Sequence, residues 1–120
     1  MPDIVTLGEA LIDLVSTESG VSLEEAPGFL RAAGGAPANV AVALSRLGKS
    51  VGFIGKVGAD PFGDFLCHTL SDEGVDTTCM LSERRAHTAL AFVSLMNNGE
   101  RDFIFYRDPG ADMFLSESDI

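Results

Sequence analysis

The fold class is decided by the stretch GGAPANVAVALSRLG, residues 34–48. Its two adjacent glycines permit positive φ and a tight turn, and Pro37 suits the first turn of a helix. Apolar residues then recur at helical spacing until Gly48, which is expected to form the C-terminal cap. The stretch therefore predicts a tight turn that leads into a helix over residues 37–48.

Segments on both sides of this helix predict an α/β protein. Residues 3–8 and 51–54 are short apolar runs that indicate buried strands. Asp60 is placed to cap a second helix, which carries an apolar stripe and ends at Gly74. Alternating strands and helices are typical of a parallel sheet covered by helices. Residues 75–85 are expected to form a link.

A second group of strands is expected to form a small separate β layer. Residues 11–15 alternate in the manner of a strand, with Asp13 on one of the two faces. Residues 29–33 follow a Pro-Gly turn. The runs 88–96 and 101–106 are joined by the sequence NNG, and Asn-Gly between two such runs is a strong hairpin signal.

Composition and charge exclude several classes of function. The chain has 120 residues, of which 46% are apolar and 22% charged, so a folded domain is expected rather than disorder. A net charge of -10 disfavours binding to nucleic acids or anionic membranes, since both need clustered basic residues. The chain shows no signal peptide and no run long enough to span a membrane. Cys67 and Cys79 lack metal-ligand spacing, and Cys67 is expected to be a buried, inert thiol, so a reducing cytoplasm is the expected location.

The glycine turn is the first candidate binding site. Gly34 and Gly35 let backbone amides approach a ligand closely, and the helix start adds unpaired N–H groups that suit oxygen-rich ligands. Asn39 offers a donor and acceptors for a hydroxyl group. The alternative is a tight strand-to-helix turn with an exposed Asn39. The turn is neither a P-loop nor a dinucleotide-binding turn, because the required Gly-Lys-Ser/Thr and Gly-x-Gly-x-x-Gly patterns are missing.

Asp13 and Arg107 are the other two candidates. A carboxylate inside an apolar strand is costly unless it is paired, so Asp13 either accepts hydrogen bonds from sugar hydroxyls or protects a sheet edge from aggregation. Arg107 follows an aromatic run and either grips a hydroxyl or carboxylate or is an exposed charge at a strand end. Lys56 is expected to be solvated or ion-paired. His68 and His87 have no partner in the sequence that indicates catalysis.

Two glycine-rich motifs, found in order, make the sequence similar to a known family. Residues 34–48, followed by GKVGADPFG at 55–63, resemble the N-terminal signature of the ribokinase (PfkB) family of carbohydrate kinases. The segment GEALID at 8–13 resembles the opening strand of that family. TALAFV at 88–93 and FYR at 105–107 resemble fructokinases in particular. The similarity covers essentially all 120 residues.

The resemblance implies an α/β fold with a Rossmann-like parallel sheet, flanking helices and a small β lid. The lid strands would lie near residues 11–16, 28–33 and 88–107. The sugar-binding residues implied by the family pattern are Asp13, Gly34, Gly35 and Asn39 for the hydroxyls, with Phe105 and Arg107 covering and gripping the sugar. Ala91 stands where the related 2-keto-3-deoxygluconate kinases carry a larger aromatic residue, which favours a fructose-like substrate. Lid strands of the family commonly form homodimer contacts.

The chain departs from the family in its length and in one missing motif. Members are more than twice as long, and their second signature, Asp-x-x-Gly-Ala-Gly-Asp, supplies the catalytic base and an anion hole. No such run is present in residues 1–120. The resemblance thus implies that ATP and Mg2+ are bound by a C-terminal half that is absent here, and that this chain alone is inactive. A helix-capping pattern at 116–119, one residue before the end, likewise predicts a truncated, incomplete domain.

The leading functional hypothesis is the sugar-binding part of an ATP-dependent, fructokinase-like enzyme that phosphorylates a primary hydroxyl of a sugar. One alternative is a non-catalytic sugar-binding or regulatory module, and another is a fragment that pairs with a full-length kinase. A parallel sheet that lacks its later strands is expected to expose apolar surface and an open edge, so the isolated chain is predicted to be poorly soluble.

Overall fold

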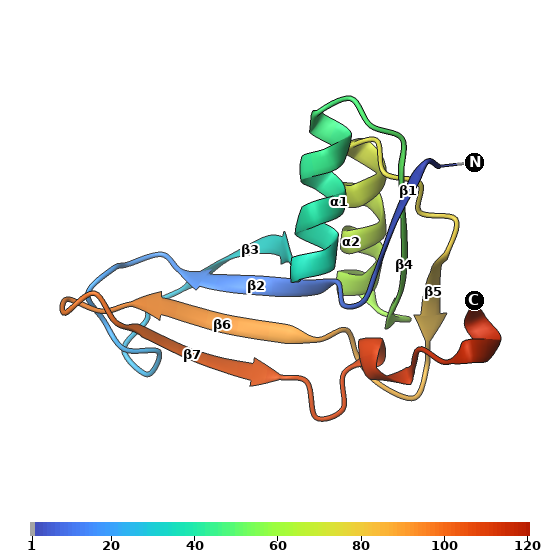
Figure 1. Ribbon diagram of the computed structural model, residues 1–120. Coiled ribbons are helices and arrows are strands. Elements are labelled where there is room, and N and C mark those ends of the chain that lie inside the picture. The colour runs from blue at the N-terminus through green and yellow to red at the C-terminus, as the bar shows by residue number, and fades with distance from the viewer. Residues whose placement is uncertain (1) are drawn as a thin grey trace.

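The computed structural model describes residues 2–120, which form two β-sheets that contact the same two helices (Figure 1). Two short 3-10 turns, η1 and η2, end the chain. In chain order the elements are β1 (Ile4–Leu7), β2 (Leu11–Ser16), β3 (Phe29–Gly34), α1 (Ala36–Arg46), β4 (Val51–Gly58), α2 (Pro61–Asp72), β5 (Met80–Glu83), β6 (Leu90–Leu95), β7 (Arg101–Tyr106), η1 (Ala111–Phe114) and η2 (Glu117–Asp119).

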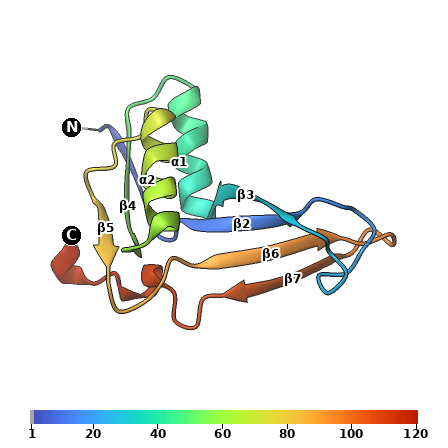
Figure 2. The ribbon, with the colours of Figure 1, turned by 180° about the vertical axis from the view of Figure 1, so that it is seen from behind.

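The first sheet is parallel and has the strand order β1-β4-β5. Helices α1 and α2 lie side by side against one of its faces, as both views show (Figures 1 and 2). Side chains alternate between the two faces of a strand. Ile4 of β1 packs against the core, so Val5 and Leu7 lie on the other face of the sheet, where about half of the surface of each residue is exposed. This arrangement confirms the predicted α/β class and the predicted parallel sheet with flanking helices.

The second sheet has the order β3-β2-β6-β7 and extends sideways from the first (Figure 1). Strand β2 is antiparallel to β3 and parallel to β6, and β6 and β7 form an antiparallel hairpin. The predicted NNG turn closes that hairpin, with the Met96 amide donating to the Glu100 carbonyl at 2.8 Å. The separate β layer and its hairpin are therefore confirmed.

The hydrophobic core lies where the two sheets meet the helices. Ile12 of β2, Phe53 of β4, and Leu66 and Leu70 of α2 are almost completely buried in it. Burying each such side chain stabilises the fold by roughly 1.5–3 kcal/mol. Because the core takes residues from both sheets, it fixes the base of the second sheet relative to the helices.

Asp60 connects the second helix to the base of the second sheet. Its Oδ1 accepts the Gly63 amide at 2.8 Å, which confirms the predicted N-cap of α2. The same carboxylate accepts the Thr88 amide at 2.9 Å and the Thr88 hydroxyl at 2.7 Å, just before β6 begins. Burial opposes ionisation, but the hydrogen bonds from Thr88 and Gly63 outweigh it and hold the pKa of Asp60 below its usual value.

Three local predictions need correction. Strand β4 continues to Gly58, four residues beyond the predicted end. Residues 80–83, within the expected link, form β5, which pairs with residues 55–58 of β4. The capping bonds predicted at the end of the chain are present, with the Ser116 amide donating to Asp119 at 2.9 Å, but they close a single 3-10 turn rather than an α-helix. A short strand such as β5 is determined by its partner strand, which a local pattern does not reveal.

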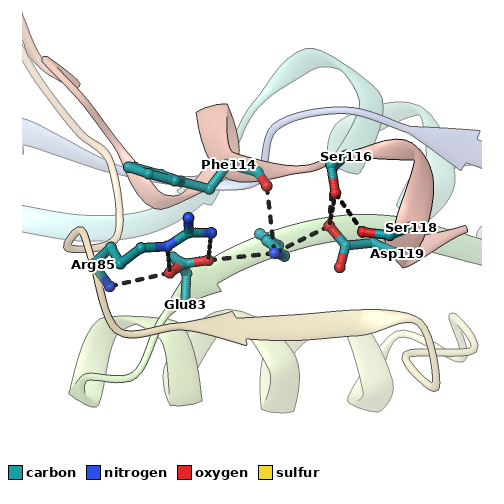
Figure 3. A network of polar contacts seen from close by, with 7 residues as sticks. Glu83, Arg85, Phe114, Ser116, Ser118 and Asp119 are labelled. Carbon is teal, nitrogen blue, oxygen red and sulfur yellow. Dashed lines mark hydrogen bonds and ion pairs between the residues drawn. The ribbon is translucent and has the colours of Figure 1, made fainter.

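A buried ionic network attaches η1 and η2 to the first sheet. Lys56 Nζ lies 3.0 Å from Asp119, 3.3 Å from Glu83 and 3.3 Å from the Phe114 carbonyl oxygen. Arg85 binds the same Glu83 carboxylate and stacks on the Phe114 ring (Figure 3). Of the two roles predicted for Lys56, the ion-paired one is confirmed.

Candidate functional site

Asp13 lies at the centre of the second sheet. In the strand register it is opposite Ala32 of β3 and Ala91 of β6, and Ala91 is in turn opposite Phe105 of β7. Asp13, Ala91 and Phe105 therefore form a row across three strands on one face of the sheet. They line a cavity of about 560 Å³, here called the Asp13 cavity, together with Val15, Val93, Leu95, Arg101 and Phe103.

The chemistry of the Asp13 cavity suits a hydroxylated ligand. Burial raises the pKa of the Asp13 carboxyl, and within residues 2–120 no charge or hydrogen bond contributes a shift that opposes this effect. The carboxylate thus has oxygen lone pairs available, while its neighbours in the row are the small Ala91 and the aromatic Phe105. Such a site can accept hydrogen bonds from two adjacent hydroxyl groups and pack a ring on the apolar face of a sugar.

Gly34 and Gly35 form the junction between this sheet and α1. A Cβ atom on Gly34 would lie 2.3 Å from Asp13 Oδ2, and one on Gly35 would lie 2.5 Å from the Glu9 carbonyl oxygen. Gly35 also has φ 97°, a conformation that disfavours other residues. These contacts account for both glycines as packing requirements. The start of α1 has no side-chain cap, so its first amides are available to a ligand.

Asn39 lies apart from the Asp13 cavity. Its side chain is exposed on the first turn of α1 and lines a groove of about 360 Å³ between α1 and α2, together with Ala33, Arg46, Thr69 and Glu73. That groove and the Asp13 cavity have no lining residue in common. The structure thus brings together Asp13, Gly34 and Phe105, but not Asn39.

Arg107 lies at the end of β7 and lines a second cavity, of about 660 Å³, called the Arg107 cavity. Phe105 lines both cavities, so the two cavities meet at its side chain. Arg107 donates from Nε at 2.9 Å and from Nη2 at 2.5 Å to Asp112 Oδ2. These hydrogen bonds are the main reason why the pKa of Arg107 is raised.

Asp112 is a site residue that the sequence did not reveal. Nothing in the local pattern separates it from the exposed Asp108, and only the folded structure shows that Asp112, in η1, meets Arg107. Within residues 2–120, no three histidine, cysteine or acidic side chains lie close enough together to hold a metal ion. In the same part of the chain, neither helix is long and apolar enough to cross a membrane.

The sequence is similar to those of carbohydrate kinases. The model of the pfkB family carbohydrate kinases matches residues 1–120. Fructokinase-1 of Zea mays is 55% identical over 117 residues, which are 98% of this chain and 36% of the relative. A probable chloroplastic fructokinase-6 of Arabidopsis thaliana is 56% identical over 119 residues, which are 99% of this chain and 31% of the relative. The chain thus spans about a third of the length of these relatives.

Solved structures likewise match nearly the whole of this chain with a little more than a third of their own length. Fructokinase from Xylella fastidiosa superposes with a TM-score of 0.87 at 47% identity, covering 98% of this chain and 36% of that one. An uncharacterized sugar kinase from Pyrococcus horikoshii, determined in complex with ATP, superposes with a TM-score of 0.91 at 44% identity, covering 98% of this chain and 38% of that one.

Proposed function

The chain belongs to the pfkB family of carbohydrate kinases, and on this premise we propose that it is the sugar-binding part of an ATP-dependent fructokinase. The observation that carries the proposal is the row of Asp13, Ala91 and Phe105, which combines an available carboxylate, a small residue and an aromatic ring on one face of the second sheet. Fructokinases among both the sequence relatives and the structural neighbours support fructose as the substrate.

In this proposal the Asp13 carboxylate accepts hydrogen bonds from two neighbouring hydroxyls of the sugar. The amides that follow Gly34 and Gly35 donate to sugar oxygens at the start of α1. Asn39 is assigned to a sugar hydroxyl on the family pattern, and its side chain lines the α1–α2 groove. Together these groups would fix the sugar so that one primary hydroxyl faces the phosphate donor.

We assign the second sheet the role of a lid over the sugar, with strands near 11–16, 28–33 and 88–107. It is joined to the rest of the protein at its base, where the Thr88 hydroxyl accepts the Gly58 amide of β4 and Thr88 contacts Asp60. Phe105 would cover the sugar and exclude water, while Arg107 donates a hydrogen bond from the adjacent cavity.

The phosphate donor is proposed to be ATP with Mg2+. The family and the structural neighbour determined with ATP support ATP as the donor. Mg2+ is proposed from the family resemblance. Because residues 2–120 hold no cluster that fits a metal ion, no residue of this chain is assigned to Mg2+ and no step is derived through it. ATP would supply the phosphoryl group; the residues of this chain bind the sugar, orient its hydroxyl and exclude water.

We also propose that the second sheet forms a homodimer contact. Farther from the base of the sheet than Asp13 and Phe105, the same face carries Phe103, which is 55% exposed, and Val15 and Leu95, which are 43% and 52% exposed. A second copy of the chain would cover these exposed apolar side chains.

The proposed function is tested by measuring ADP release from ATP with the complete gene product and a panel of sugars. Fructose is expected to give a higher kcat/KM than ribose or 2-keto-3-deoxygluconate. A folded protein that turns over none of these sugars would refute the kinase proposal, and a preference for the keto-acid would refute the choice of fructose.

A further inference from the structure

The positive charge of the Arg107 guanidinium is balanced by a single oxygen atom, Oδ2 of Asp112. Both its Nε and its Nη2 donate to Asp112 Oδ2, at 2.9 Å and 2.5 Å. Within residues 2–120, the third nitrogen, Nη1, donates to no acceptor, and 38% of the side chain stays exposed in the Arg107 cavity. The guanidinium therefore offers an N–H donor to a ligand while its charge is balanced by a neighbour.

Asp112 is held in place by close packing. Its side chain is only 3% exposed, and a Cβ atom on Gly110 would come within 2.7 Å of Oδ1 and 3.0 Å of the Ala89 methyl carbon. The Ala111 amide donates to the His87 carbonyl at 2.8 Å, which fixes the loop against the base of β6. A buried carboxylate is stable only when it is paired, so Asp112 and Arg107 hold each other in one orientation.

The charges around Arg107 are unfavourable for an anionic ligand. The pKa of Arg107 is raised first by its hydrogen bonds to Asp112 and further by the charge of Glu9. Within residues 2–120, Asp112 Oδ1 has no hydrogen-bond partner that could disperse its charge. A carboxylate ligand needs an uncompensated positive charge to replace its hydration, whereas a neutral hydroxyl needs only a well-placed donor.

We infer that Asp112 makes this site select neutral sugars over sugar acids, by balancing the charge of Arg107 and fixing its orientation. Asp112 acts through Arg107 and is thus a positioning and specificity residue that does not itself need to touch the sugar. The inference rests on the proposed function, since it assumes that the ligand of Arg107 is the sugar.

The test compares Asp112→Asn with Asp72→Asn in the complete gene product. Asp72 is exposed at the end of α2 and lines neither cavity, so the control makes the same chemical change away from Arg107. Calorimetric titrations with fructose and with gluconate, and steady-state kinetics with fructose, give the readouts. Asp112→Asn is expected to raise the KM for fructose and to tighten gluconate binding, each by about tenfold, with a smaller change in kcat. Asp72→Asn is expected to change neither.

A purely structural role for Asp112 predicts a different pattern. It would weaken fructose and gluconate alike, and that result, or an unchanged gluconate affinity, would overturn the inference. If Asp112→Asn does not fold, Asp112→Ser takes its place and must tighten gluconate binding relative to Asp72→Asn. If the wild type does not phosphorylate fructose, the proposed function fails, while the gluconate titrations still decide whether Asp112 controls the charge of the site.

Discussion

The Asp13 carboxylate occupies the space that a Cβ atom on Gly34 would need, because an ideal Cβ there would lie 2.3 Å from Oδ2 and 2.7 Å from Cγ. The two residues come from adjacent antiparallel strands, β2 and β3. Gly34 is also the last residue of β3 before the turn into α1. The position of the carboxylate is thus coupled to the start of the helix.

Gly34→Ala is expected to push the Asp13 side chain aside or to separate the two strands. The resulting overpacking should lower the free energy of unfolding by about 1–3 kcal/mol. Fructose affinity of the complete gene product should fall by about tenfold, because a displaced carboxylate loses its hydrogen bonds to the sugar. Urea unfolding and calorimetry measure the two effects.

Gly28→Ala is the matched control for this change. A Cβ atom there would lie 3.5 Å from the Thr17 hydroxyl, an ordinary contact, so a stability change within about 0.5 kcal/mol is expected. The coupling of Gly34 to Asp13 would be disproved if both variants had the same stability and the same fructose affinity.

Ala91→Phe is expected to fill the Asp13 cavity, because Ala91 is 3% exposed between Asp13 and Phe105. A phenyl ring in this row would occupy the volume proposed for the sugar. Fructose binding should weaken by at least about tenfold, at a stability cost of about 1–3 kcal/mol. Calorimetry on protein shown to be folded by circular dichroism checks this, and unchanged fructose binding would place the sugar elsewhere.

The sequence alone predicted the parts of the fold that local chemistry controls. The ends of α1 follow from Pro37 and Gly48, and the start of α2 follows from the Asp60 cap. The hairpin follows from its Asn-Gly turn. Strand β5 was missed because four residues carry no pattern of their own until β4 pairs with them.

The candidate site was less predictable because it depends on contacts between distant segments. The sequence identified Asp13 and Arg107 as candidates, and family resemblance added Phe105. The row that joins Asp13 to Phe105 through Ala91 requires the register of three strands. The pairing of Arg107 with Asp112 requires the folded loop, since the neighbouring Asp108 has the same chemistry and no such contact.

Lys56→Met is expected to destabilise the chain by leaving Glu83 and Asp119 without their shared cation. The urea midpoint at pH 7 should fall, while Lys49→Met, on an exposed side chain, should leave it nearly unchanged. Equal midpoints for the two variants would show that the network does not stabilise the fold.

The same network predicts a loss of stability in acid. Hydrogen bonds from Arg85 lower the pKa of Glu83 from its usual 4.5, and those from the Ser116 amide and Lys56 lower the pKa of Asp119 from its usual 3.8. The folded state thus binds fewer protons than the unfolded state, so the network stabilises the fold fully when the pH is above the usual pKa values of both groups. This stabilisation is lost as the pH falls below those pKa values. Urea unfolding at pH 7 and pH 3 checks this prediction. The free energy of unfolding should differ less between the two pH values for Lys56→Met than for the wild type.

Phe103→Asp is expected to disrupt the proposed dimer. It places a charge on the exposed apolar face that carries Asp13, whereas Ile104→Asp places the same charge on the opposite face of β7. Analytical ultracentrifugation of the complete gene product should show a monomer only for Phe103→Asp. A wild-type monomer, or a dimer that survives this change, would rule out this surface as the interface.

The most direct test of the sugar site is a calorimetric titration of fructose into the complete gene product and its Asp13→Asn variant. Burial raises the pKa of Asp13, so the charge is unfavourable in the folded state and the variant should melt at pH 7 no lower than the wild type. We expect fructose to bind the wild type and Asp13→Asn to weaken binding by at least about tenfold, because the neutral amide accepts weaker hydrogen bonds. Equal affinity of the two proteins for fructose would contradict this expectation.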